Sequence, residues 1–222
     1  KNKVDPTLSY MLILENKMYE ANLEISREKF INYGKELKLF PGVNDWFKRI
    51  KKFGKEKNVD VEHYIISSGL TNMIEGCSFF NELNRVYACE YIFKNGRGLW
   101  PKLSVNYSNK VQFLYRIHKG AFEVNDQEGV NEKKYFGDHI HVPFENMIFF
   151  GDGETDVPTF NVLNKNNGKS ICVYDDKNQK STDIAKKLFS DGRVHHLVKN
   201  DYQEKSGIDV LLKEIIKTKS EN

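Results

Sequence analysis

The stretch MIFFGDGETD, residues 147–156, joins an apolar run of strand length to an acidic loop that contains two glycines. The segment that follows, Val157 to Phe160, has the pattern of a first helical turn. In open α/β sheets, ligands bind at the loops that follow the carboxyl ends of parallel strands. Asp152 and Asp156 therefore place two carboxylates where a hard divalent cation such as Mg²⁺ would bind. The alternative is that the two aspartates only cap the helix.

The composition is that of a soluble globular protein and argues against two classes of partner. Apolar residues make up 39% of the 222 residues and charged residues 29%, and no apolar run approaches the roughly 18 residues of a membrane-spanning helix. The 34 basic and 31 acidic side chains leave a net charge of only +3, which is too balanced to indicate binding to nucleic acid or to a membrane. Lysines between residues 48 and 57 alternate with apolar positions, which is typical of a solvated helix face.

Three cysteines, Cys77, Cys89 and Cys172, are widely spaced and odd in number. This pattern favours reduced thiols in a cytoplasmic protein over a disulfide framework or a zinc site. No apolar segment follows the polar start of the chain, so no signal peptide is predicted. Because the chain begins with Lys1 in place of methionine, we expect it to be a fragment of a longer protein.

Strands alternate with helices along most of the chain, which predicts an α/β fold with a parallel, doubly wound sheet. Amphipathic spacing predicts two helices within residues 1–39 and a third over residues 43–53. Strands are then predicted at 59–66, 86–88, 147–150, 170–174 and 194–198, a hairpin at 91–100 around an Asn-Gly turn, and helices at 69–74, 110–118, 184–189 and 208–216. The polar stretch 123–142 lacks periodicity and is predicted to be a surface excursion.

Two further segments place a polar group where a strand ends or a helix begins. Ser67 directly follows a predicted strand, and its hydroxyl, with the amides of Ser68 and Gly69 at a helix N-terminus, could hold a phosphate oxygen. Lys110 opens a predicted helix, where its ammonium could offset the negative charge of a substrate and of neighbouring aspartates. Phosphoryl transfer needs such groups, because its catalysis is mainly positioning and charge stabilisation. The alternatives are that Ser67 is a turn residue and that Lys110 is solvated surface.

The order of these segments resembles the motif order of the haloacid dehalogenase (HAD) superfamily, on its phosphoserine-phosphatase-like side. Residues 65–69, IISSG, are similar to its second motif, a strand that ends in Ser or Thr. Lys110 matches the lysine of the third motif, and residues 151–156, GDGETD, match the fourth motif, GDGxxD, which is the most diagnostic. The resemblance spans roughly residues 40–174, and local phrases such as LFPGV and DVP are similar to an uncharacterised bacterial branch of the superfamily.

The resemblance implies a Rossmann-like core with a helical cap inserted before the second motif. Residues 1–39 would then be part of the cap, and residues 40–222 the core. It also implies a Mg²⁺-dependent phosphatase that hydrolyses a small phosphorylated metabolite through an aspartyl-phosphate intermediate.

The resemblance further implies a role for each matched residue. Ser67, beside Ser68 and Gly69, would hydrogen-bond the transferring phosphoryl group. Lys110 would stabilise both that group and the nucleophile. Asp152 would ligate Mg²⁺, and Asp156 would support the metal site directly or through water.

The first motif of the superfamily, DxDxT after an apolar strand, is absent from the chain. This motif supplies the nucleophilic aspartate and a general acid/base. Residues 4–8, VDPTL, are similar only to its tail, because Lys3 stands at the nucleophile position and no apolar strand precedes it. Asp5 is instead predicted to cap a helix. We therefore expect the strand and the nucleophile to lie in a missing N-terminal segment, so that this chain alone would bind cation and phosphate without turnover.

Other interpretations remain open at this point. A non-catalytic protein could keep the fold and a cation and phosphate pocket without a nucleophile, whereas a dehalogenase acting at carbon is disfavoured because GDGxxD and Mg²⁺ suit phosphoryl oxygens. His139 and His141 alternate as on a strand but have no third ligand in sequence, so their roles are undetermined. For His195, burial or a hydrogen bond is predicted, and residues 175–176, two aspartates, are predicted to form a turn. Substrate identity and oligomeric state do not follow from the sequence.

Overall fold

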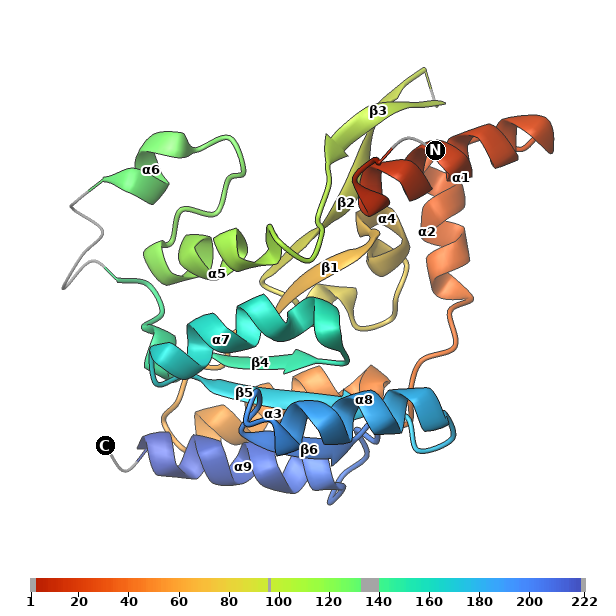
Figure 1. Ribbon diagram of the computed structural model, residues 1–222. Helices are drawn as coiled ribbons and strands as arrows, with labels where there is room; N and C mark the ends of the chain where they lie inside the picture. Colours follow the sequence, from red (N-terminus) through yellow and green to blue (C-terminus); the bar gives the residue numbers. More distant parts are fainter. Residues whose placement is uncertain (1–2, 96, 133–139, 221–222) are drawn as a thin grey trace. The chain divides into compact units, whose positions relative to one another are not determined.

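The computed structural model describes residues 3–95, 97–132 and 140–220. The chain divides into two compact units, residues 1–106 and 107–222, and each unit combines helices with a three-stranded sheet (Figure 1). The predicted α/β class is confirmed at this level. The boundary between residues 39 and 40, and the HAD-like arrangement of the core, stay predictions. No helix in the described ranges has the length and hydropathy needed to cross a bilayer.

The first unit begins with helices and continues into a mixed sheet. In chain order its elements are α1 (Pro6–Glu20), α2 (Arg27–Lys35), α3 (Val43–Glu56), β1 (Tyr64–Leu70), α4 (Thr71–Glu75), η1 (Phe80–Glu82), β2 (Arg85–Lys94) and β3 (Arg97–Leu103). Strand β1 runs parallel to β2, and β2 pairs antiparallel with β3, which confirms the predicted hairpin. Asn95, at its turn, has a φ of 51°, a left-handed conformation that asparagine tolerates better than most residues.

Helix α1 is tied to the rest of the first unit at its start and along its length. Asp5 accepts hydrogen bonds from the backbone amides of Thr7 and Leu8, both at 2.9 Å, which confirms the predicted cap. The other carboxylate oxygen of Asp5 accepts from the side-chain amide of Asn106 at 2.6 Å. Further along, the buried Tyr91 hydroxyl of β2 donates to a carbonyl of α1 at 2.6 Å.

The second unit is a parallel α/β layer. Its elements are α5 (Lys110–Lys119), α6 (Gln127–Asn131), η3 (Phe144–Asn146), β4 (Ile148–Gly151), η4 (Glu154–Asp156), α7 (Val157–Lys165), β5 (Lys169–Tyr174), α8 (Gln179–Ser190), β6 (His196–Lys199) and α9 (Gly207–Ser220). Strands β4, β5 and β6 pair in that order, all parallel. Helices connect successive parallel strands, as the predicted alternation requires.

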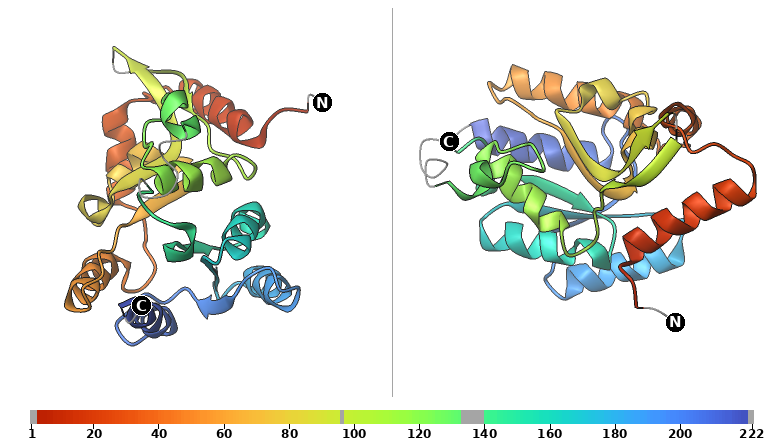
Figure 2. Two further views of the ribbon diagram at one scale, coloured as in Figure 1. Left: turned by 90° about the vertical axis from the view of Figure 1, so that its left-hand side faces the viewer. Right: turned by 90° about the horizontal axis from the view of Figure 1, so that it is seen from above.

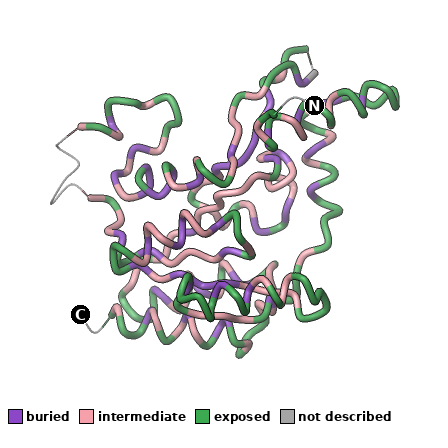
Figure 3. Tube along the Cα trace, viewed as in Figure 1, coloured by how far each residue is buried: buried purple, intermediate pink, exposed green. Residues whose placement is uncertain are grey.

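Helices cover both faces of this parallel sheet. Helices α7 and α8 lie on one face and α9 lies on the other (Figure 2). The α7–α8 face is closed by a cluster of buried apolar side chains, and the outer turns of α8 are exposed (Figure 3). The members of the cluster are Phe160, Cys172, Ala185, Leu188 and Val194. This packing fixes the strands, so the loops at their carboxyl ends have defined positions.

Several predicted boundaries were wrong for identifiable reasons. The strand predicted at 59–66 begins only at Tyr64, because Val59 donates its amide to the Gly54 carbonyl and Val61 packs against Gly54 at the end of α3. The strand at 86–88 and the first half of the hairpin form one strand, β2. The excursion 123–142 includes α6, and its residues 133–139 lie outside the described part. In place of one doubly wound sheet, the described residues form one mixed and one parallel sheet.

Candidate functional site

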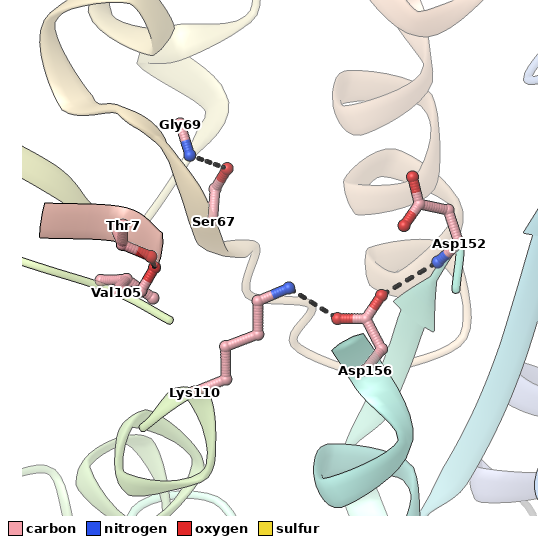
Figure 4. Close-up of polar contacts among 7 residues, drawn as sticks. All are labelled: Thr7, Ser67, Gly69, Val105, Lys110, Asp152 and Asp156. Atoms are coloured by element: carbon pink, nitrogen blue, oxygen red, sulfur yellow. Dashed lines mark hydrogen bonds and ion pairs between the residues drawn. The ribbon is translucent and has the colours of Figure 1, made fainter. Parts of the chain in front are cut away.

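A buried ion pair joins Lys110 to Asp156 in the second unit (Figure 4). The lysine Nζ lies 2.6 Å from Oδ1 of Asp156, and the two side chains are 10% and 4% exposed. Lys110 is the first residue of α5, and the buried side chains of Phe113, Leu114 and Ile117 hold one face of that helix against the core. The alternative that Lys110 is solvated surface is therefore wrong.

Asp156 also holds the loop that carries Asp152. Its Oδ2 accepts a hydrogen bond from the backbone amide of Asp152 at 3.0 Å. Asp156 occupies the position before α7, but its side chain makes no capping hydrogen bond to that helix. The interpretation that this aspartate only caps a helix is thus wrong. Since both of its oxygens are engaged, Asp156 orients the lysine and the loop.

Gly151 allows this close approach. A Cβ atom at position 151 would lie 2.7 Å from the Cβ of Asp156 and 2.6 Å from Cζ of Phe160. Both distances are too short for carbon atoms in contact, which pack at about 3.5–4.0 Å. The first glycine of the GDGETD loop is therefore required by packing around Asp156.

The surroundings of Asp152 disfavour the ionised form of its carboxylate. Asp152 is an exposed residue directly after β4. Its pKa is raised above the ordinary value, chiefly because its carboxylate is partly desolvated and then because of the negative charge of Asp156, while Lys110 acts in the opposite direction. A cation placed beside Asp152 would lower the pKa of this carboxyl and so favour its ionised form.

The described residues would supply at most part of a Mg²⁺ site. In residues 3–95, 97–132 and 140–220, no group of three His, Cys, Asp or Glu side chains is arranged to hold a metal by itself. Mg²⁺ does not require one, because it commonly binds one or two carboxylates together with water and substrate phosphate oxygens. Asp152 can serve as such a carboxylate. If Asp156 ligated the metal directly, it would have to use a carboxylate oxygen that already accepts a hydrogen bond from Lys110 or from the Asp152 amide.

Ser67 lies on β1 in the first unit (Figure 4). It pairs there with Ala88 of β2. Its Oγ accepts a hydrogen bond from the backbone amide of Gly69 at 3.0 Å. The hydroxyl proton of Ser67 is therefore free to donate elsewhere. Its convergence with Lys110 and Asp152, which belong to the second unit, stays a prediction.

The prediction that Ser68 and Gly69 stand at a helix N-terminus was wrong. Strand β1 continues to Leu70 with a register shift after Ser67, and the five-residue α4 begins at Thr71. The reason is local: the Ser67 hydroxyl binds the Gly69 amide, and the Ser68 carbonyl accepts from a tyrosine hydroxyl at 2.7 Å. The Gly69 amide is thus not available to hold a phosphate oxygen.

The histidines take structural positions where they are described. The backbone amide of Ser170 donates to Nδ1 of His195 at 3.2 Å, and Ser170 Oγ lies 3.0 Å from the same nitrogen, which confirms the predicted hydrogen bond. The ring of His141 lies edge-on to Phe122, with 5.1 Å between ring centres. His139 lies outside the described residues, so its pairing with His141 is not tested.

Two other polar residues follow strands of the parallel sheet. Asp175, after β5, accepts the Lys177 backbone amide at 3.1 Å, which confirms the predicted turn. Asn200, directly after β6, is 7% exposed and was not singled out from the sequence. The sequence signal that could have identified Asn200 is a polar residue directly after a strand, which is also the position of Asp152 after β4.

Comparison with known proteins gives a distant relative. The chain is 28% identical over 218 residues to an uncharacterized protein of Borreliella burgdorferi, a match that covers 88% of this chain and 72% of that protein. No protein-family model matches the sequence. No solved structure matches it either.

Proposed function

We propose that the protein is a Mg²⁺-dependent phosphatase of the HAD type that hydrolyses a small phosphorylated metabolite. The proposal depends most on one observation. The buried pair Lys110–Asp156 holds the loop of Asp152, and Asp152 is an exposed residue at the carboxyl end of β4. The sequence similarity of residues 151–156 to GDGxxD supports the same assignment.

In the proposed site, each residue acts through its charge or its hydrogen bonds. Lys110, held in one position by Asp156, offsets negative charge on the phosphoryl group. Ser67 donates its hydroxyl proton to a phosphoryl oxygen, because its Oγ already accepts from Gly69. Asp152 holds Mg²⁺, which when bound stabilises the charge on the phosphate oxygens.

The proposed reaction also needs a nucleophilic carboxylate. Its oxygen attacks phosphorus and forms an aspartyl phosphate as the bond to the leaving oxygen breaks, and water then hydrolyses this acyl phosphate. Neither aspartate of the GDGETD loop suits this role, because Asp156 is bonded through both oxygens and Asp152 is assigned to the metal. The resemblance assigns the nucleophile to a first motif that residues 1–222 do not contain.

That same observation supports a second candidate, a protein that binds a cation and phosphate without hydrolysis. Lys110 and Asp152 would contribute one cation and one carboxylate to such binding, and no group of three His, Cys, Asp or Glu side chains completes a metal site in the part of the chain that is described. The two candidates share the binding site and differ only in turnover.

The test uses the complete gene product and p-nitrophenyl phosphate. We expect hydrolysis that depends on Mg²⁺ and that falls by at least about 100-fold in Asp152→Asn, the size expected when a transition-state charge interaction is lost. Asp176→Asn is the control, because Asp176 is an exposed aspartate of the same unit whose ion pair with Lys199 lies on the surface. Mg²⁺ binding through Asp152 without turnover would favour the binding protein, and absence of both would reject both candidates.

A further inference from the structure

Strand β1 contains a bulge directly after Ser67. Ser67 is the last residue of β1 in the regular register with β2, and pairing resumes only at Leu70. Ser68 and Gly69 therefore have no counterpart on β2. Bulges leave backbone groups unpaired and redirect neighbouring side chains, and they are frequent beside active sites. The position of the Ser67 hydroxyl thus depends on how this bulge is held.

The peptide group between Ser68 and Gly69 is hydrogen-bonded at both of its ends. Its carbonyl oxygen, on Ser68, accepts a hydrogen bond from the Tyr10 hydroxyl of α1 at 2.7 Å, although the two residues lie 58 apart in the chain. Its amide, on Gly69, donates to the Oγ of Ser67 at 3.0 Å (Figure 4). Because a peptide group is planar, a bond that fixes the direction of its carbonyl also fixes the direction of its amide. The Tyr10 bond therefore orients the amide that the Ser67 oxygen faces.

Contacts on both sides of the bulge hold Tyr10 and the strand in place. The next residue of α1, Met11, is fully buried, and its carbonyl accepts a hydrogen bond from the Tyr91 hydroxyl of β2 at 2.6 Å. After the bulge, the Thr71 hydroxyl donates to the carbonyl of Ala88 on β2 at 3.2 Å. Burial raises the pKa of the Tyr10 phenol, so this group keeps its proton at neutral pH. Helix α1 therefore presents a fixed hydrogen-bond donor to the bulge.

We propose that Tyr10 is a positioning residue for the hydroxyl of Ser67 and acts through the peptide group between Ser68 and Gly69. The inference rests on the proposed function, in which Ser67 donates to a phosphoryl oxygen. Hydrogen bonds in a chain polarise one another, so the Tyr10 bond makes the Gly69 amide a stronger donor to Ser67. With its oxygen held by that amide, the serine keeps its own proton for an anionic ligand. Tyr10 itself touches no substrate.

The first test is a double-mutant cycle on the affinity of the complete gene product for inorganic phosphate at saturating Mg²⁺. Tyr10→Phe keeps the ring and removes the donor, so it should weaken phosphate binding about three- to tenfold, the size of one hydrogen bond. In a Ser67→Ala background the same substitution should have little effect, because the hydroxyl through which Tyr10 acts is already absent. Tyr19→Phe is the control, because Tyr19 lies on the same helix and is 82% exposed, and it should alter binding in neither background.

A second measurement reports on the bulge without any ligand. The amide proton of Gly69, followed by ¹H–¹⁵N NMR, should shift upfield in Tyr10→Phe because its hydrogen bond to Ser67 weakens. Ser67→Ala removes the acceptor and should shift the same signal further, whereas Tyr19→Phe should leave it in place.

Two results would overturn the inference and leave the proposed function intact. One is an equal effect of Tyr10→Phe on phosphate binding in both backgrounds, including no effect in either, because Tyr10 would then not act through Ser67. The other is a Gly69 amide signal that does not move in Tyr10→Phe. A complete protein that binds neither Mg²⁺ nor phosphate would overturn both.

Discussion

Lys110 and Asp156 form a 2.6 Å ion pair in the second unit, and the second oxygen of Asp156 accepts the backbone amide of Asp152. The two aspartates of the GDGETD loop therefore have different tasks. Asp156 is neutralised by the lysine and serves as a fixed support, whereas Asp152 stays exposed with a raised pKa. A loop with two equivalent carboxylates would have no such division.

Lys110→Met should strongly destabilise the protein. The substitution leaves Asp156 as a buried carboxylate without its cation, a change that costs about 3–5 kcal/mol in the free energy of unfolding. Chemical denaturation measures the loss. Lys199→Met is the matched control, because Lys199 lies at the same 2.6 Å from Asp176 but both partners are about half exposed. We expect no measurable loss there. Equal stability of both variants would contradict this prediction.

Asp152→Asn should stabilise the protein at neutral pH in the absence of metal. The folded-state pKa of Asp152 lies above its ordinary value of 3.8. Between these two values the unfolded chain binds fewer protons than the folded one, so stability falls as pH rises through that window. An asparagine at position 152 does not titrate, so the variant does not lose this stability as the pH rises. Thermal unfolding should show the gain at pH 7 and lose it below pH 3.8, whereas a less stable variant at pH 7 would refute the assignment.

Gly151→Ala should disturb the site through packing alone. The new methyl group would meet Asp156 at 2.7 Å and Phe160 at 2.6 Å, so one of these neighbours has to move. Overpacking of this kind typically costs about 1–3 kcal/mol. Gly153→Ala is the control, because no atom lies within 4 Å of a Cβ there. Urea denaturation of the two variants compares the costs, and equal losses would show that crowding at Asp156 is not the cause.

His63 should make the first unit sensitive to mild acid. Its ring is buried against Trp46 and Phe47, neither ring nitrogen has a hydrogen-bond partner in the described residues, and burial with the nearby charge of Lys51 lowers its pKa to about 4. Between the ordinary value of 6.5 and about 4, the unfolded chain binds a proton that the folded one does not, so stability falls as pH falls.

The loss in the free energy of unfolding should reach roughly 3 kcal/mol near pH 4. His63→Phe keeps a ring in the cluster and removes the titration, so its stability should depend less on pH between 6.5 and 4. Unfolding curves of the two proteins across this range provide the comparison. Parallel pH profiles would show that His63 does not titrate on unfolding.

The sequence predicts the elements of this protein better than it predicts their contacts. Hydrophobic periodicity and the Asn-Gly turn locate the helices and the hairpin, because these signals depend on residues close in the chain. The strand start near Val59 was wrong because a contact with Gly54 replaces pairing. The helix start at residue 69 was wrong, because the Ser67 hydroxyl binds the Gly69 amide and α4 begins only at Thr71.

The candidate site shows the same limit. The GDGETD pattern identifies Asp152 and Asp156 as a pair, but their different tasks depend on Lys110, which lies 46 residues from Asp156 along the chain. Spacing carries no information about which carboxylate a distant lysine neutralises. Asn200 was missed because an asparagine after a strand is also an ordinary turn residue.

The hydrogen bond between Asp5 and Asn106 has a consequence for the first unit as a whole. These residues stand near its two boundaries, and their side chains meet at 2.6 Å. This one contact therefore tethers the beginning of α1 to the end of the segment that follows β3, so the described helices and strands of the first unit lie within a single closed stretch of chain.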